Sequence, residues 1–172
     1  MEKMSTRHMT QVSILVAISA IFYYFELPLP GVPLKMDFSD LPVLIGGYMM
    51  GPVYGILIAL LKNVIHVIAI SNNSNLAGEL ANFSFAVLMM IPVLLAKGKP
   101  IVKKIALSAI GLLITVGLMH LINYYVTFPL YGMDKSTAMS QLIAIFLPFN
   151  IFKGVILLVI MTIMERYLDK IN

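Results

Sequence analysis

The chain has 172 residues, of which 60% are hydrophobic and 12% charged, and its formal net charge is +4. The mean hydropathy of +0.94 lies outside the range of soluble domains and indicates a polytopic membrane protein. In such a chain the basic excess reflects membrane topology, and no nucleic-acid motif is present, so a nucleic-acid partner is not expected. The absence of cysteine excludes disulfides and thiolate chemistry.

Residues 9–25 form the first predicted membrane span, near the lower length limit for crossing a hydrocarbon core of about 30 Å. The basic residues before it resemble those of a secretory signal, but every later segment is also membrane-like, which favours a retained helix. Ser13, Ala17 and Ala20 share one helix face, and small side chains allow a second helix to approach closely. This face is a candidate docking surface for a partner membrane subunit, with packing inside the bundle as the alternative.

Four prolines follow between residues 27 and 42, and Lys35, Asp37 and Asp40 lie among them. Proline lacks a backbone N–H and restricts the residue before it, so this stretch cannot be a continuing helix. We predict an ordered loop that acts as a lid.

The number of spans depends on residues 41–70, where Gly51 and Pro52 interrupt an apolar run. Two crossings there place the basic cluster at 97–104 and both termini in the cytoplasm, whereas one crossing places that cluster outside, against the positive-inside rule. We therefore expect an all-α membrane protein with six transmembrane helices in one bundle. The predicted spans are 9–25, 41–50, 52–70, 78–97, 102–125 and 138–168, with external loops at 71–77 and 126–137, in a single domain covering 1–172.

Gly47, Gly51 and Gly55 recur every four residues, a spacing that in membrane helices indicates close packing. Pro52 interrupts the series. The pattern therefore predicts a close, kinked meeting of the second and third spans.

Polar residues in the spans are the candidates for function, because a charge in hydrocarbon costs several kcal/mol. Lys153 follows Asn150 by three residues on one helix face, and alanine at either position is expected to weaken ligand binding without unfolding the protein. Several of these candidates also have a structural alternative. Lys153 would extend its ammonium group to the membrane surface, Tyr124 would belong to an interfacial belt of tyrosines, and Glu79 would stabilise a helix N-terminus. The predicted pocket lies at the outward ends of the helices and suits a planar, largely neutral molecule. The candidate substrate-binding residues are Leu34, Lys35, Met36, Asp37, Phe38, Glu79, Asn82, Asn123, Tyr124, Asn150 and Lys153.

Lys62, Asn63 and His66 share one face of the third span. A structural polar cluster or a partner contact is favoured over a proton relay. No His/Asp/Glu set has the spacing of metal ligands, so no metal site is predicted. No nucleophile motif or Walker loop is present either. The sequence therefore does not predict an enzyme, and a secondary transporter using Lys62, His66 and Glu79 remains an alternative.

Four motifs carry a resemblance to a known family: LPGVPLKMDFSDLP (29–42), GPVYGILIALLKN (51–63), GELANF (78–83) and LPFNIFKG (147–154). With them the chain resembles the substrate-binding S components of energy-coupling factor (ECF) vitamin transporters, and most closely those specific for riboflavin. The resemblance covers essentially the whole chain. An S component for another vitamin is the nearest alternative.

The resemblance implies a non-enzymatic protein of the bacterial plasma membrane that captures riboflavin from outside. It implies as partners a transmembrane coupling subunit, two cytoplasmic ATPases and the lipid bilayer, with no cofactor other than the transported ligand. It also implies that Asn123, Asn150 and Lys153 bind the flavin or its ribityl chain, and that residues 34–38 cover it. The family's first helix carries Ala-x-x-x-Ala for docking, and here Ser13-x-x-x-Ala17 replaces that pattern, followed by Ala20.

Overall fold

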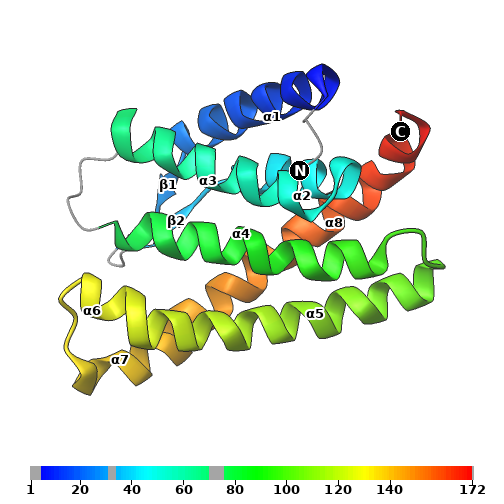
Figure 1. Ribbon diagram of the computed structural model, residues 1–172. Helices are drawn as coiled ribbons and strands as arrows, with labels where there is room; N and C mark the ends of the chain where they lie inside the picture. Colours follow the sequence, from blue (N-terminus) through cyan, green and yellow to red (C-terminus); the bar gives the residue numbers. More distant parts are fainter. Residues whose placement is uncertain (1–4, 31–33, 70–75, 172) are drawn as a thin grey trace.

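A computed structural model describes residues 5–30, 34–69 and 76–171, and Figure 1 shows the arrangement of its helices. In this part of the chain the helices form six rods. Helix α1 begins and α8 ends at the same end of the bundle, opposite the short strands (Figure 1). The elements are α1 (Thr6–Tyr24), β1 (Leu27–Pro28), β2 (Lys35–Met36), α2 (Asp40–Met50), α3 (Pro52–Ala69), α4 (Ala77–Ala96), α5 (Ile101–Ile122), η1 (Asn123–Thr127), α6 (Phe128–Leu130), α7 (Lys135–Gln141), η2 (Leu142–Phe146) and α8 (Leu147–Ile171).

The helices coincide with the predicted apolar segments, and four stretches of the described chain are long and apolar enough to cross a membrane. These stretches are Pro52–Ala69, Ala77–Ala96, Ile101–Leu130 and Ser136–Lys170. Helix α2 has 11 residues and is therefore only about 16 Å long, short of a hydrocarbon core of about 30 Å. The four long stretches establish a multi-span helical protein, whereas a count of six crossings stays a prediction.

Helices α2 and α3 meet at glycines, as predicted. Gly51 ends α2 with a φ of 102°, a conformation that glycine adopts without steric cost, and Pro52 begins α3. A Cβ placed on Gly55 would lie 3.0 Å from the Cα of Gly47. The close, kinked meeting of the two helices is thus confirmed.

The core lies between α2, α4, α5 and α8, where Leu44, Met89 and Leu157 are buried. Polar contacts reinforce the end of this core away from the strands. The Tyr48 hydroxyl oxygen lies 2.9 Å from a Glu165 carboxylate oxygen and 2.7 Å from one of Asp169, so it can donate to either, and Lys104 forms an ion pair with Glu165. We call Tyr48, Lys104, Glu165 and Asp169 the distal cluster.

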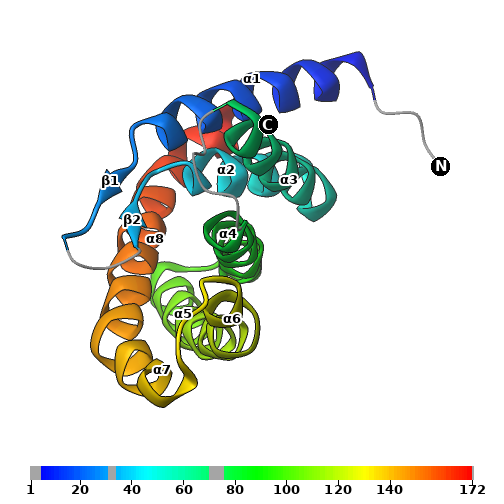
Figure 2. The ribbon, with the colours of Figure 1, turned by 90° about the vertical axis from the view of Figure 1, so that its left-hand side faces the viewer.

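The proline-rich loop contains a small antiparallel ladder that its sequence does not predict. Strands β1 and β2 pair Leu27 with Met36 and Pro28 with Lys35. Pro28 lacks an N–H and is tolerated because both strands are edge strands. Seen from the end of the bundle, β2 lies beside α8 (Figure 2).

The predicted loop at 126–137 is largely helical, which corrects that prediction. Helix α5 continues through the π-helical η1 into α6, and α7 continues through η2 into α8. Each π-helical segment lies just before a proline, Pro129 or Pro148. Proline cannot donate to the carbonyl four residues earlier, and the wider π turn accommodates its ring without ending the rod.

Candidate functional site

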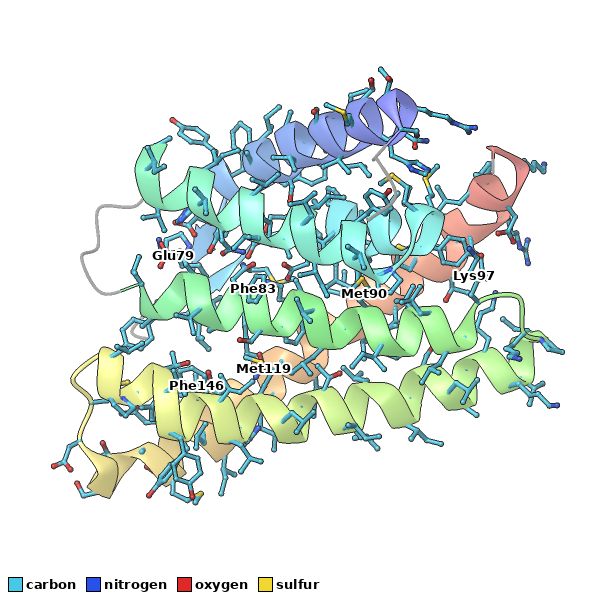
Figure 3. The ribbon with its side chains drawn as sticks, viewed as in Figure 1. Glu79, Phe83, Met90, Lys97, Met119 and Phe146 are labelled. Carbon is cyan, nitrogen blue, oxygen red and sulfur yellow. The ribbon has the colours of Figure 1, made fainter. Side chains whose placement is uncertain are left out.

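A cavity of about 200 Å³ lies at the end of the bundle that carries the hairpin. Figure 3 places Glu79 at this end of α4 and Lys97 at the opposite end. The hairpin, the first turns of α4, the π-helical segment η1 and the start of α8 enclose the cavity. Its lining residues are Tyr23, Glu26, Pro28, Leu34, Lys35, Asp37, His66, Gly78, Glu79, Ala81, Asn82, Phe85, Met119, Asn123, Thr127, Tyr131, Phe146, Phe149, Asn150 and Lys153.

Apart from His66 Nε2, which lies 3.7 Å from Glu26, three buried polar atoms of the lining have no hydrogen-bond partner within the described residues. They are Oδ1 of Asn123, Oγ1 of Thr127 and Nδ2 of Asn150, on side chains whose residues are 1%, 0% and 5% exposed. An unsatisfied buried polar group costs about 1–3 kcal/mol. In a cavity of this size, a polar ligand or ordered water can supply the missing partners.

The π-helical turn of η1 carries two of these three groups. Asn123 begins η1 and Thr127 ends it, and both side chains line the cavity. Single π turns inside α-helices occur frequently at functional sites. The turn that accommodates Pro129 therefore also forms part of the cavity wall.

Aromatic rings form much of the remaining wall. Phe85, Tyr131, Phe146 and Phe149 line the cavity, and the Lys153 ammonium lies 5.3 Å from the centroid of the Phe85 ring. Aromatic walls combined with a few placed polar groups are typical of sites for small, flat molecules.

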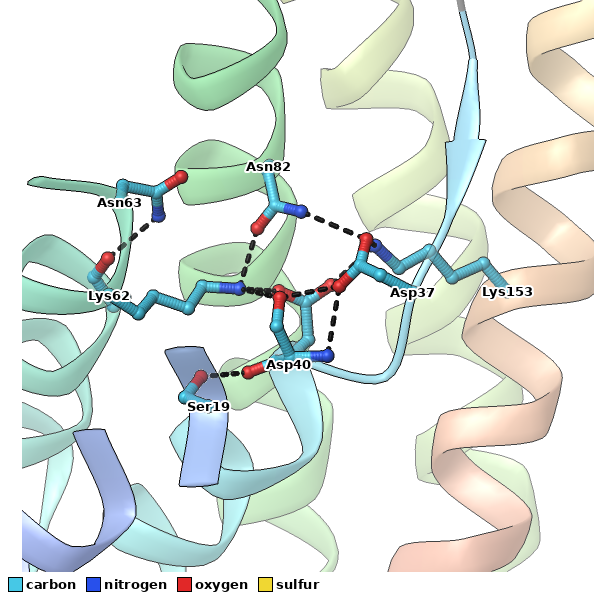
Figure 4. Close-up of polar contacts among 9 residues, drawn as sticks. Ser19, Asp37, Asp40, Lys62, Asn63, Asn82 and Lys153 are labelled. Carbon is cyan, nitrogen blue, oxygen red and sulfur yellow. Dashed lines mark hydrogen bonds and ion pairs between the residues drawn. The ribbon is translucent and has the colours of Figure 1, made fainter. Parts of the chain in front are cut away.

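Two lysines and two aspartates form a buried network beside the cavity (Figure 4). Lys153 binds Asp37 at 3.1 Å and Asp40 at 2.8 Å. Lys62 pairs with Asp40, and Asn82 donates to Asp37 at 3.2 Å. The two positive and two negative charges balance, as burial in a membrane protein requires.

Asp37 lies between β2 and α2, outside the spans. Burial acts to raise the pKa of its carboxyl group, but the Lys153 and Lys62 ammonium groups and the hydrogen bonds from Ser39 outweigh burial and lower this pKa to about 2. Asp37 is therefore an anion throughout the physiological pH range.

A second polar group ties the hairpin to α3 and α4. His66 Nδ1 lies 3.0 Å from Glu79 Oε1, and His66 Nε2 lies 3.7 Å from Glu26 Oε2. Burial acts to raise the pKa of Glu26, but its contacts with His66 and Lys35 lower it. The His66 ring stacks on Tyr23 at 3.7 Å between centroids. This group closes the cavity beside the hairpin.

The structure brings most of the sequence-predicted site residues together. Three do not line the cavity. Met36 is half-buried in β2, Phe38 is 41% exposed, and Tyr124 packs against the cluster around Phe128. The predicted residues that line it are Leu34, Lys35, Asp37, Glu79, Asn82, Asn123, Asn150 and Lys153.

Several lining residues are missed by sequence reasoning. Glu26 and Thr127 lie at helix ends that the sequence places near the membrane surface, where polar residues carry little information. Tyr131 falls in the predicted loop, so only knowledge of the π-helical turn places it in the wall. The sequence identifies His66 as a polar residue inside a membrane span, but it does not show that His66 contacts Glu79 and Glu26.

Lys62 belongs to the buried network of two lysines and two aspartates, but it does not line the cavity. Its contacts with Ser39, Asp40 and Asn82 are those of a structural polar cluster. On α1, Ser13 and Ala17 are exposed and Ala20 is half-buried, so the small-residue face points largely outward.

Comparison with known proteins identifies the family. Residues 7–165 match the family described as "ECF transporter, substrate-specific component". A riboflavin transporter FmnP of Bacillus subtilis is 30% identical, with 93% of this chain and 90% of that protein covered. A riboflavin transporter RibU of Staphylococcus aureus is 29% identical, with 94% and 90% covered.

A solved structure shares the fold. It is described as "Structure and mechanism of the S component of a bacterial ECF transporter", is 26% identical, covers 96% of each chain and gives a TM-score of 0.76. Since the family match spans nearly the whole chain, this protein belongs to the substrate-specific S components of the ECF transporters, non-enzymatic membrane proteins of bacteria.

Proposed function

We propose that the protein captures riboflavin from outside the cell and delivers it to an ATP-driven transporter. The observation that carries this proposal is the group of three unpartnered polar atoms, on Asn123, Thr127 and Asn150, in a cavity with aromatic walls. Relatives named riboflavin transporters, at about 30% identity, support the same ligand.

The chemistry of riboflavin fits these groups. Its flat ring system carries carbonyl oxygens and one N–H, and its side chain carries hydroxyl groups. The free Nδ2 of Asn150 is a donor for a ring carbonyl, whereas the free Oδ1 of Asn123 is an acceptor for an N–H or hydroxyl. Aromatic lining residues provide surfaces on which the ring can stack.

The charges of the lining favour an uncharged ligand. Lys153 is paired with Asp37 and Asp40, Lys35 is paired with Glu26, and His66 contacts Glu79. No lysine that lines the described cavity is left without a carboxylate. A phosphate group entering the cavity would meet these carboxylates, so the 5′-phosphate of riboflavin is expected to bind more weakly than riboflavin.

Titration of the purified protein with riboflavin, followed by quenching of flavin fluorescence, tests the proposal. We expect saturable one-to-one quenching, with weaker binding of the 5′-phosphate and none of an unrelated vitamin such as biotin. Absence of quenching by riboflavin, together with binding of another vitamin, would assign a different substrate.

The transport partners in this proposal are a transmembrane coupling subunit and two ATPases. The coupling subunit docks on the face of α1 that points away from the rest of the bundle and carries Ser13 and Ala17. Ala17→Leu is expected to leave riboflavin affinity unchanged but to reduce uptake in cells that supply the partners. Ala109→Leu, the same change at an exposed position of α5, serves as the control and should change neither quantity.

A self-sufficient secondary transporter is the alternative, because His66 and Glu79 form a buried pair. It predicts riboflavin uptake into proteoliposomes that hold this protein alone, driven by a proton gradient. The proposed function predicts uptake only when the coupling subunit, the ATPases and ATP are present.

A further inference from the structure

Lys62 is fully buried in the middle of α3, yet it does not line the cavity. A buried lysine is costly in a membrane protein, so its contacts indicate what it does. Its ammonium has three N–H donors. One binds Ser39 Oγ at 2.7 Å, one binds Asn82 Oδ1 at 2.6 Å, and one binds Asp40.

These contacts fix the orientation of two other side chains. Because the oxygen of the Asn82 amide accepts from Lys62, its Nδ2 group faces Asp37 and donates to Oδ2 at 3.2 Å. Because Ser39 Oγ accepts from Lys62, its own hydrogen is left for Asp37 Oδ1. Lys62 thus determines which donors Asp37 receives.

Asp37, Asn82 and Lys153 in turn form a wall of the cavity. Asp37 Oδ2 accepts from both Asn82 and Lys153, and Oδ1 accepts from the backbone N–H and the hydroxyl of Ser39. Among the described residues, the donors to Asp37 other than Lys153 and the Ser39 backbone are both oriented by Lys62. Figure 4 shows this chain of contacts from Lys62 through Asn82 to Asp37 and Lys153.

We propose that Lys62 is a positioning residue for the ligand: it orients Asn82 and Ser39, and through them Asp37, so that this wall of the cavity has the shape and donors that the ligand requires. The inference rests on the proposed function for its probe, riboflavin. It assigns to Lys62 a role beyond balancing the charge of Asp40.

Charge balance and orientation are separated by a double substitution. Lys62→Met removes the three donors and leaves Asp40 with Lys153 as its remaining cation, so both thermal stability and affinity should fall. Lys62→Met combined with Asp40→Asn restores neutrality, because the network then contains one lysine and one aspartate. It does not restore the donors that orient Asn82 and Ser39.

The measurements are the melting temperature in detergent and the Kd for riboflavin. We expect the double variant to recover most of the lost melting temperature while its Kd stays roughly tenfold above that of the wild type. Adding Asn82→Ala to the double variant should raise the Kd little further, because Lys62 acts through Asn82. Lys104→Met, which breaks an ion pair in the distal cluster, should lower the melting temperature with the wild-type Kd.

Three outcomes overturn the proposal. A double variant with wild-type Kd would show that Lys62 only balances charge. A Kd unchanged in Lys62→Met itself would show that the wall does not depend on Lys62. Failure of both Lys62 variants to fold would make Lys62 a residue required for folding alone. If the wild type does not bind riboflavin, the proposed function fails before any variant is compared, so the two failures are distinguishable.

Discussion

Asn123 and Asn150 are the residues whose removal tests the cavity most directly, because each presents a buried polar atom without a partner among the described residues. If the proposed function is correct, alanine at either position removes a hydrogen bond to riboflavin. Because the atom that is lost has no partner among the described residues, no other protein group loses a hydrogen bond to it. We expect each change to weaken riboflavin binding by about 1–3 kcal/mol, a rise in Kd of roughly five- to 150-fold. Fluorescence titration measures the Kd, and the melting temperature without ligand should not fall.

A rise in the melting temperature of the unliganded alanine variants would be consistent with relief of an unsatisfied group. A wild-type Kd in both variants would contradict the assignment of the site. Ser108→Ala, a change in α5 at a residue that does not line the cavity, provides the matched control.

For Lys153, the structure changes the expected effect of an alanine substitution on stability. From the sequence, Lys153→Ala should weaken binding and leave folding intact. The structure shows that Lys153 contacts both Asp37 and Asp40, so its loss leaves two buried carboxylates to share Lys62. Lys153→Ala should therefore lower stability as well as affinity, whereas Asn150→Ala, like Asn123→Ala, separates the two effects.

At the scale of elements, the close approach of α2 and α3 makes Gly55 sensitive to any side chain. A methyl group at Gly55 would lie 3.0 Å from the Gly47 Cα and would contact Met90, so the helices must separate. We expect Gly55→Ala to destabilise the protein by about 1–3 kcal/mol, seen as a lower melting temperature.

Gly117 is the control for this prediction. It lies within α5 and is exposed, and a methyl group added there would meet open space, with no neighbouring atom within 4 Å. Gly117→Ala should leave stability within about 1 kcal/mol of the wild type. Equal melting temperatures for the two variants would mean that the helices are less closely packed than described.

The π-helical segments show how an element can carry a site that its sequence partly conceals. Pro129 lies in the predicted loop at 126–137, whereas Pro148 lies inside the predicted span 138–168. In the structure both rods continue through a wider turn just before the proline, and η1 places Thr127 and Asn123 in the cavity wall. A proline identifies where the backbone must change but not whether the chain turns away or continues.

At the scale of the whole molecule, α1 begins and α8 ends at the end opposite the cavity. The positive-inside rule places this end, with Lys103 near the start of α5, in the cytoplasm. The chain has no cysteine, so single cysteines can be introduced and labelled without a background. In intact cells Asp134→Cys should react with a membrane-impermeant thiol reagent, whereas Lys103→Cys should react only after the membrane is opened. The reverse pattern would show that the cavity faces the cytoplasm.

The class, the number of helical rods and most of the polar residues that line the cavity could be predicted from the amino-acid sequence. Hydropathy reports the energy of transferring each segment into lipid, which depends on composition alone, and intramembrane amides and lysines are conspicuous because they are costly there. The motifs also identified the family that the comparisons establish.

The pairing of the polar residues, and with it which of them have no partner, could be seen only in the packed structure. Asp40 appears in the sequence as part of a lid, yet it lies beneath the cavity wall, between Lys62 and Lys153. Asn123 and Asn63 look alike in the sequence, but Asn63 donates to the Ala59 carbonyl of its own helix whereas Asn123 lines the cavity. Whether a buried group has a partner depends on distances of about 3 Å between elements remote in the chain, and these distances are fixed only when the helices pack.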